Sequence, residues 1–307
     1  MSAWRRALAP AKLNLRLEVL GKREDGFHEL DTDLLAIDLF DELRARVMPG
    51  AELSLRLAGP ALTDDVPADN RNLAFRAARL VQREAQARGR TDVGLELELT
   101  KRIPSQAGLG GASSDAVAAL LLADAVLGTQ LGDAWLGDRA AELGSDCRFF
   151  LDARSGHARC TGRGELVEPL AAVPSRWSIA LASPAALCPT PEVFGALHFP
   201  LPPLSDSARL GAWSNSGPGA PRLGNQLEEA AFRACPDLTP WREALAGPRY
   251  AGWQLSGSGS SVFALFPAGE GARPALDALR EEARERGLKL RFDAVVRPAG
   301  HGAQLVD

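Results

Sequence analysis

The sequence predicts a protein of about two domains that combines β-strands with α-helices. The chain has 307 residues, 46% of them hydrophobic, so it is long enough for two domains that each bury a core. Its first half contains segments in which apolar and polar residues alternate, as in half-buried strands, together with segments of helical periodicity. Its last part has the pattern strand, helix, strand, which indicates a β-α-β unit at the end of a second domain.

Three alternating segments predict strands in the first half. Leucines and a valine alternate over residues 13–19, and this pattern puts Lys12 and Asn14 on the opposite, polar face. A turn with the sequence GKREDGFHEL follows. Similar alternation predicts two further strands over residues 53–57 and 93–99.

Three helices are predicted between and after these strands. Residues 70–88 carry their apolar side chains on one stripe, which is typical of a helix packed on a core. Residues 116–128 are apolar nearly all round, as a buried helix would be, and Gly128 offers a stop. A third helix is expected over residues 132–144, with the sequence GDAWLGDRAAELG.

The second half ends with a predicted strand over residues 262–266, an amphipathic helix over 274–286 and a strand over 292–296. Before them, residues 201–222 are rich in Pro, Gly and Ser without any period, which predicts a long surface loop. The pattern changes near residue 160. We therefore expect one domain over residues 1–160 and another over residues 161–307.

Composition argues against several classes of partner. The net charge is −4 and Lys and Arg are dispersed, so no basic face for a nucleic acid is expected. An acidic balance disfavours anionic lipid, and no apolar run approaches the ~20 residues of a membrane span. The four cysteines are far apart and lack metal-ligand spacing with histidines. We expect a reduced, cytoplasmic protein with no nucleic-acid or membrane partner and no metal held by the protein.

The segment IPSQAGLGGASSDA, residues 103–116, lies between a predicted strand and the buried helix. Glycines and a helix N-terminus can direct unpaired N–H groups at a phosphate. The alternative, which is commoner for an arbitrary glycine cluster, is a turn in which Ser113 caps the helix. The Walker motif fails because its lysine is absent, and the dinucleotide pattern started at Gly108 fails at Ser113. Asp115 is expected to be structural, in the first helical turn.

Three segments together resemble a known superfamily. PSQAGLGGASSDA, APAKLNLRL and LSGSGSSVFALF are similar to the motifs of the GHMP kinases, named for galactokinase, homoserine kinase, mevalonate kinase and phosphomevalonate kinase. The resemblance implies an α+β fold with an N-terminal ATP-binding domain, a C-terminal ferredoxin-like substrate domain and an active site between them.

Within the superfamily, nearly the whole chain resembles one branch. The matching segments include GKREDGFHEL, NLAFRAARL, LGSDCRFF, GRGELVEPL, PTPEVF and GNQLEEAAF. This branch uses ATP to phosphorylate the 2-hydroxyl of cytidylylated methylerythritol in the non-mevalonate isoprenoid pathway. The alternatives are another GHMP-type kinase of a small alcohol and a non-catalytic nucleotide-binding homologue. GFHEL and PTPEVF favour the first reading, because a substrate without cytidine needs no base clamp.

The resemblance implies roles for three polar residues near the reacting groups. It makes Asp146 the base that takes the hydroxyl proton, Lys12 its cationic partner, and Asn14 a contact near the acceptor hydroxyl. Judged from their own sequence context, Asp146 would more often be a turn or cap residue, and Lys12 a solvated lysine on a strand.

The resemblance also implies two binding regions. The cytidine region comprises Phe27, where the family has tyrosine, with His28, Thr190 and Phe194, while Gly257 and Gly259 approach the remainder of the substrate. The ATP region comprises Asn72 and Lys101 near adenine and the phosphate-binding residues Pro104, Ser105, Gln106, Ala107, Gly108, Leu109, Gly110, Gly111, Ala112, Ser113 and Ser114. Mg²⁺ is expected to arrive with ATP.

One departure from the family pattern follows the proposed base. The family has Val-Pro where this chain has Cys147 and Arg148. We hypothesise that Arg148 adds positive charge near the phosphates.

Overall fold

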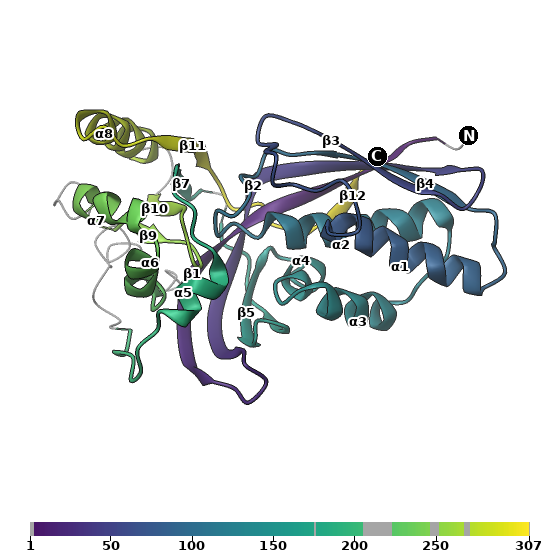
Figure 1. Ribbon diagram of the computed structural model, residues 1–307, viewed down its shortest axis with the longest axis horizontal. Coiled ribbons are helices and arrows are strands. Elements are labelled where there is room, and N and C mark those ends of the chain that lie inside the picture. The colour runs from purple at the N-terminus through teal and green to yellow at the C-terminus, as the bar shows by residue number, and fades with distance from the viewer. Residues whose placement is uncertain (1–2, 175, 205–222, 246–251, 267–270, 307) are drawn as a thin grey trace.

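The computed structural model describes five ranges of the chain: 3–174, 176–204, 223–245, 252–266 and 271–306. They form two β-sheets, each covered by its own group of helices, that follow one another along the longest axis of the molecule (Figure 1). Both termini lie at the end of the larger, N-terminal sheet. No helix within the described ranges is long and apolar enough to cross a membrane.

The larger sheet is built on a long antiparallel pair, β1 (Arg5–Lys22) and β2 (His28–Met48). Its central order is β12-β1-β2-β4-β3. The remaining strands are β3 (Leu53–Ala58), β4 (Gly94–Thr100), β5 (His157–Gly162) beside β2, β6 (Leu166–Pro169) beside β5, β8 (Gly224–Asn225) beside β1, and β12 (Gln304–Val306).

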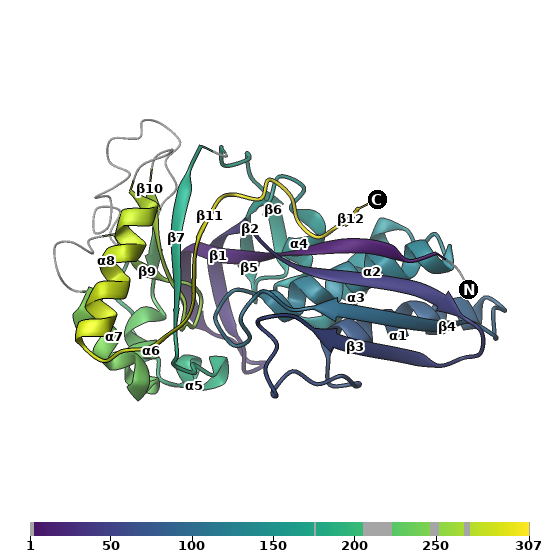
Figure 2. The same ribbon diagram turned by 90° about the horizontal axis from the view of Figure 1, so that it is seen from above.

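Four helices pack against the larger sheet (Figures 1 and 2). They are α1 (Leu73–Ala87), α2 (Gly111–Leu127), α3 (Asp133–Leu143) and α4 (Cys147–Asp152). Helix α2 lies between the sheet and the other helices, which explains why its sequence is apolar nearly all round. Its N-terminus points toward the junction of the two sheets.

The smaller sheet has the order β11-β7-β10-β9 with antiparallel neighbours. Its elements are β7 (Ser178–Pro184), α5 (Thr190–Gly195), α6 (Glu228–Ala234), a 3₁₀ turn (Pro236–Leu238), α7 (Thr239–Leu245), β9 (Gln254–Leu255), β10 (Val262–Phe266), α8 (Ala272–Glu285) and β11 (Leu290–Val296). Strand β7 separates β10 from β11, so two β-α-β units interleave. This is the expected ferredoxin-like arrangement.

The two faces of the smaller sheet bury different partners. Ala180 and Ala182 of β7 face the core formed with helices α6 and α8. Ile179 and Leu181 point the other way, into a core shared with Leu13 and other residues of the larger sheet. This second core therefore joins the two sheets directly.

The predicted strands and helices are confirmed, with three differences. Strand β1 begins at Arg5 and its polar face is buried, because a turn from the second domain covers Lys12 and Asn14. The 21-residue strand β2 was not expected. Asp115 lies one turn into α2, beyond the first turn. The boundary at residue 160 stays a prediction, and β5 spans it; most of the predicted 201–222 loop lies outside the described residues.

Candidate active site

A pocket of about 1010 Å³ opens between the two sheets. This volume is at the upper end for small-molecule sites and leaves space for two ligands side by side. The residues predicted for catalysis, ATP and substrate all line it except Ser114, which is buried in α2, and Gly259, which belongs to the turn after β9 and packs against Leu255 and Cys188. The fold therefore gathers positions from both halves of the chain into one cavity.

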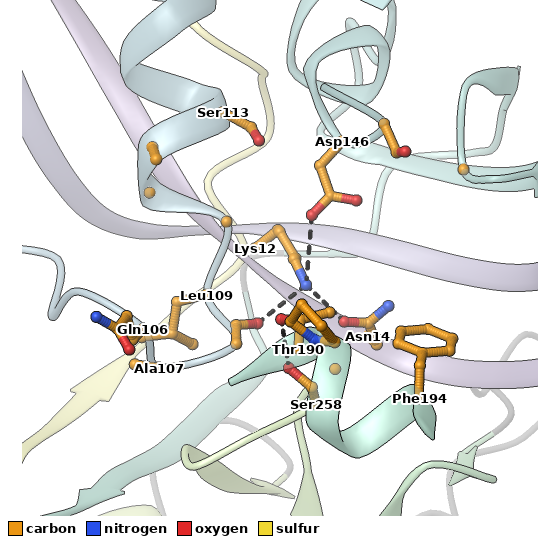
Figure 3. A pocket seen from close by; sticks show the side chains of 18 of the residues that line it. Lys12, Asn14, Gln106, Ala107, Leu109, Ser113, Asp146, Thr190, Phe194 and Ser258 are labelled. Atoms are coloured by element: carbon orange, nitrogen blue, oxygen red, sulfur yellow. Dashed lines mark hydrogen bonds and ion pairs between the residues drawn. The ribbon is translucent and has the colours of Figure 1, made fainter. Parts of the chain in front are cut away.

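Lys12 is at the centre of the pocket (Figure 3). Its Nζ donates hydrogen bonds to Asn14 Oδ1 at 2.6 Å and to the Gly108 carbonyl at 2.9 Å. The same Nζ lies 3.7 Å from Asp146 Oδ2. Burial lowers the pKa of Lys12, and the Asp146 carboxylate acts in the opposite direction. One ammonium group therefore connects strand β1, the glycine segment and the start of α4.

Asn14 is fixed by a second set of contacts. It lies two residues from Lys12 on β1, so both side chains leave the strand on the same face. Its Nδ2 donates to Thr32 Oγ1 at 2.9 Å, and the Thr32 hydroxyl donates to the Arg16 carbonyl at 2.6 Å. These hydrogen bonds orient the Asn14 amide so that its Oδ1 accepts from the Lys12 ammonium.

Asp146 immediately precedes α4 and reaches into the pocket from the side opposite Thr190 and Phe194 (Figure 3). Its side chain is 34% exposed, whereas that of Lys12 is 6% exposed. A carboxylate that keeps contact with solvent and has an ammonium at one oxygen can accept a proton from a bound hydroxyl.

The glycine segment forms both a turn and a helix N-terminus. Gly110 is the N-cap of α2 in the left-handed conformation, φ +69°, and no side chain caps the helix. Because Ser113 does not cap, the first N–H groups of α2 are left for a ligand, as a phosphate would require. Gly108, φ +73°, packs so closely that a Cβ there would lie 2.1 Å from the Ser256 carbonyl oxygen. The segment is therefore fixed between Lys12 and the second domain.

The two predicted adenine-side residues have protein partners for their polar atoms. Asn72 caps α1 by accepting from Ala74 N at 2.9 Å, and its Nδ2 donates to the Pro67 carbonyl at 2.8 Å. Lys101 is buried between two carboxylates, Asp41 and Asp115, with the latter at 2.7 Å.

Asp115, which we expected to be structural, lines the pocket, and its partner differs from the predicted helix dipole. It forms an ion pair with Lys101. Burial raises the pKa of Asp115, while the Lys101 ammonium acts against this rise. Lys101, Asp41 and Asp115 form a buried charged cluster beneath the glycine segment, and Asp41 Oδ1 also accepts from Ile103 N at 2.9 Å.

Aromatic rings gather at the other end of the pocket. The His28 ring centroid lies 4.9 Å from that of Phe194 and 6.2 Å from that of Phe199, nearly parallel to the latter. Thr190 Oγ1 lies 3.0 Å from Ser258 Oγ, which ties α5 to the glycine turn after β9. Phe27 is 51% exposed, so its ring is available to a flat ligand.

Sequence reasoning missed several pocket residues and misjudged one. Phe199 and Arg163 both line the pocket. Phe199 lies outside the segments singled out from the sequence, whereas Arg163 lies in the matching segment GRGELVEPL, for which no role was predicted. Asn225 holds the turn after β9 by donating to the carbonyls of Leu255 and Gly257 at 2.9 and 2.8 Å, a role that the segment GNQLEEAAF could have suggested.

The hypothesis that Arg148 faces the phosphates is wrong. Arg148 is not among the residues that line the pocket. It pairs with Asp152 of the same helix at 2.6 Å, and its guanidinium packs against Gly137 of α3.

Two family models match the chain, and relatives match almost all of it. The models for the GHMP kinases N terminal domain and the GHMP kinases C terminal match residues 72–151 and 205–287. A 4-diphosphocytidyl-2-C-methyl-D-erythritol kinase from Synechococcus sp. is 36% identical over 334 aligned positions that cover 100% of both chains.

Solved structures agree with these matches. A crystal structure of 4-(cytidine 5'-diphospho)-2C-methyl-D-erythritol kinase is 35% identical, with a TM-score of 0.68 over 95% of this chain and 99% of that one. Homoserine kinase from Cytophaga hutchinsonii shares the fold at 20% identity, with a TM-score of 0.69 over 100% and 98% of the two chains. This chain belongs to the GHMP kinases and, within them, to the family of the 4-diphosphocytidyl-2-C-methyl-D-erythritol kinases.

Proposed function

We propose that this ATP-dependent small-molecule kinase transfers the γ-phosphoryl group of ATP to the 2-hydroxyl of 4-diphosphocytidyl-2-C-methyl-D-erythritol, a step in isoprenoid precursor synthesis. Membership of the family supports this reaction. The single observation that carries the site assignment is the position of the Lys12 ammonium, within 3.7 Å of Asp146 and 2.9 Å of the Gly108 carbonyl. It connects a candidate base to the candidate phosphate loop.

ATP binds, in this proposal, along the glycine segment and α2. The uncapped N-terminus of α2 and the left-handed glycines fit a chain of phosphates. Asn72 and Lys101 border the adenine side. Lys101 does so as part of the buried cluster that it forms with Asp41 and Asp115. Mg²⁺ accompanies the nucleotide and neutralises part of the phosphate charge when bound. We name no protein ligand for it.

The chemical step needs a proton acceptor and an aligned hydroxyl. Asp146 takes the proton of the 2-hydroxyl while that oxygen forms a bond to the γ-phosphorus, and the bond from the γ-phosphorus to the bridging oxygen of ADP breaks. The Lys12 ammonium stabilises the negative charge that develops on the attacking oxygen. Asn14 orients Lys12 through the 2.6 Å hydrogen bond.

The cytidine end of the substrate binds among the aromatic residues. Phe27, His28 and Phe194 offer ring faces and an imidazole to the base, with Thr190 beside them. The turn that contains Gly257 and Gly259 covers the erythritol end. The enzyme works in the cytoplasm on two small molecules, without a nucleic-acid partner.

A coupled ADP-release assay with three alcohols tests this proposal. We expect turnover with the cytidylylated methylerythritol and none above background with homoserine or mevalonate, since neither fills the aromatic end of the pocket. Preferential turnover of either of these two alcohols would contradict the proposed substrate.

A further inference from the structure

Arg163 occupies the tip of the turn between β5 and β6. Gly162 and Gly164 flank it in conformations with positive φ, +74° and +113°. The backbone N–H of Arg163 donates to Glu165 Oε2 at 2.6 Å. Two left-handed glycines and this bond define the shape of the turn, so the root of the arginine side chain is well positioned.

The turn extends from the aromatic end of the pocket to the candidate base. On one side, the Arg163 guanidinium carbon lies 4.8 Å from the centroid of the Phe27 ring. On the other side, a Cβ added to Gly164 would lie 3.8 Å from Asp146 Oδ1. Arg163 and Gly164 both line the pocket. The arginine is thus placed between the region that would hold the cytosine and the region that would hold the reacting hydroxyl.

Two carboxylates, those of Glu165 and Asp25, lie close enough to act on the charge of Arg163. Within the described residues, its guanidinium forms an ion pair through Nε with Glu165 Oε1 at 3.7 Å. The side chain is 30% exposed. The remaining guanidinium N–H groups form a planar fork suited to phosphate oxygens, and the cation–π contact with the Phe27 ring favours this position of the guanidinium.

The substrate of the proposed reaction carries a diphosphate between its cytidine and its methylerythritol. If the base lies by Phe27 and the 2-hydroxyl lies by Asp146, the diphosphate must pass the turn that carries Arg163. We propose that the Arg163 guanidinium binds this diphosphate while it lies over the Phe27 ring, and that it helps the enzyme select cytidylylated alcohols. This inference rests on the proposed function and adds a residue to it.

The test compares Arg163→Gln, which keeps a planar amide near the ring without charge, with Arg163→Lys, which keeps the charge. Arg154→Gln is the matched control, because Arg154 is a surface arginine whose side chain is 90% exposed. The measurements are kcat and KM for both substrates, and the inhibition constants of cytidine diphosphate and cytidine.

For Arg163→Gln we expect KM for the alcohol and the inhibition constant of cytidine diphosphate to rise about 10- to 100-fold, the range for a lost hydrogen bond to a charged group. KM for ATP and inhibition by cytidine should stay within about threefold. Arg163→Lys should recover part of the loss, and Arg154→Gln should match the wild type.

Equal weakening of cytidine and cytidine diphosphate would overturn the inference, because Arg163 would then only support the Phe27 ring. Unchanged constants in Arg163→Gln, with a wild type that turns the substrate over, would overturn this inference alone. A wild type without turnover would overturn the proposed function and this inference with it.

Discussion

The Lys12 ammonium lies 3.7 Å from Asp146 Oδ2 and also contacts Asn14 (Figure 3). Strand β1 supplies the lysine and the start of α4 supplies the carboxylate. The pair thus depends on the packing of α4 beneath the sheet. It favours the charged form of Lys12 and positions the candidate base.

Asp146→Asn should lower kcat about 100- to 10,000-fold, the range for loss of a general base, with little change in KM for ATP. The amide keeps the shape of the side chain but cannot take the hydroxyl proton. The assay is ADP release at saturating substrate, with a thermal melt as the control for folding. A variant with full kcat would contradict the assignment of the base.

The fall of kcat at alkaline pH should reflect the deprotonation of Lys12. Burial lowers the pKa of Lys12 and Asp146 opposes that shift, so kcat should fall at a pH below the ordinary lysine pKa. In Asp146→Asn the opposing charge is absent, so the alkaline fall of the residual activity should move to still lower pH. If the alkaline fall of activity in Asp146→Asn stays at the same pH or moves to higher pH, Lys12 does not titrate as described.

Lys101→Met should destabilise the fold by about 3–5 kcal/mol, the range for breaking a buried ion pair. It leaves the carboxylates of Asp41 and Asp115 buried without their cation. Burial raises the pKa of Asp115, and without the Lys101 ammonium nothing from that side opposes the rise, so the native state binds this proton more tightly than the unfolded chain and loses stability as pH rises. Urea unfolding at about pH 5 and pH 8 should show the larger loss at pH 8.

A comparison with Lys101→Met/Asp115→Asn checks this cause. Removing one buried carboxylate should restore part of the stability at pH 8. If the destabilisation of Lys101→Met were the same at both pH values, lost packing and not charge would explain it.

Gly108→Ala should destabilise the protein and abolish activity. The new methyl group would lie 2.1 Å from the Ser256 carbonyl oxygen, so the glycine segment or the second domain must move. Gly128→Ala is the matched control: Gly128 also has a positive φ, +60°, but no atom lies within 4 Å of an added Cβ. Unfolding and ADP-release measurements should show a cost of about 1 kcal/mol for Gly128→Ala with activity retained. Equal effects of the two changes would exclude the steric explanation.

Local patterns predicted much of this fold. The alternation after Lys12 and the apolar run after Ser114 are patterns of residues that are close together in the sequence. Both appear as expected, in β1 and α2. Strand β2 was missed because acidic residues such as Asp31 and Asp41 interrupt its pattern, and their partners, Arg159 and Lys101, come from distant segments.

The site was only partly predictable for a similar reason. Family motifs identified Lys12 and Asp146, but no spacing between them indicates their contact, which tertiary packing creates. Arg163 lies in GRGELVEPL, a segment that matches the family but that by itself indicates no role, and Arg148 seemed suitable only because it follows Asp146. The helix periodicity of α4 turns Arg148 toward Asp152 and away from the pocket.

The central claim is tested most directly by ³¹P NMR of a reaction that contains the protein, ATP, Mg²⁺ and the cytidylylated methylerythritol. The account predicts a new phosphomonoester resonance on the alcohol, with both diphosphate resonances of the substrate retained and ADP formed in equal amount. Consumption of ATP with release of inorganic phosphate, or no new phosphomonoester on this alcohol, would contradict it.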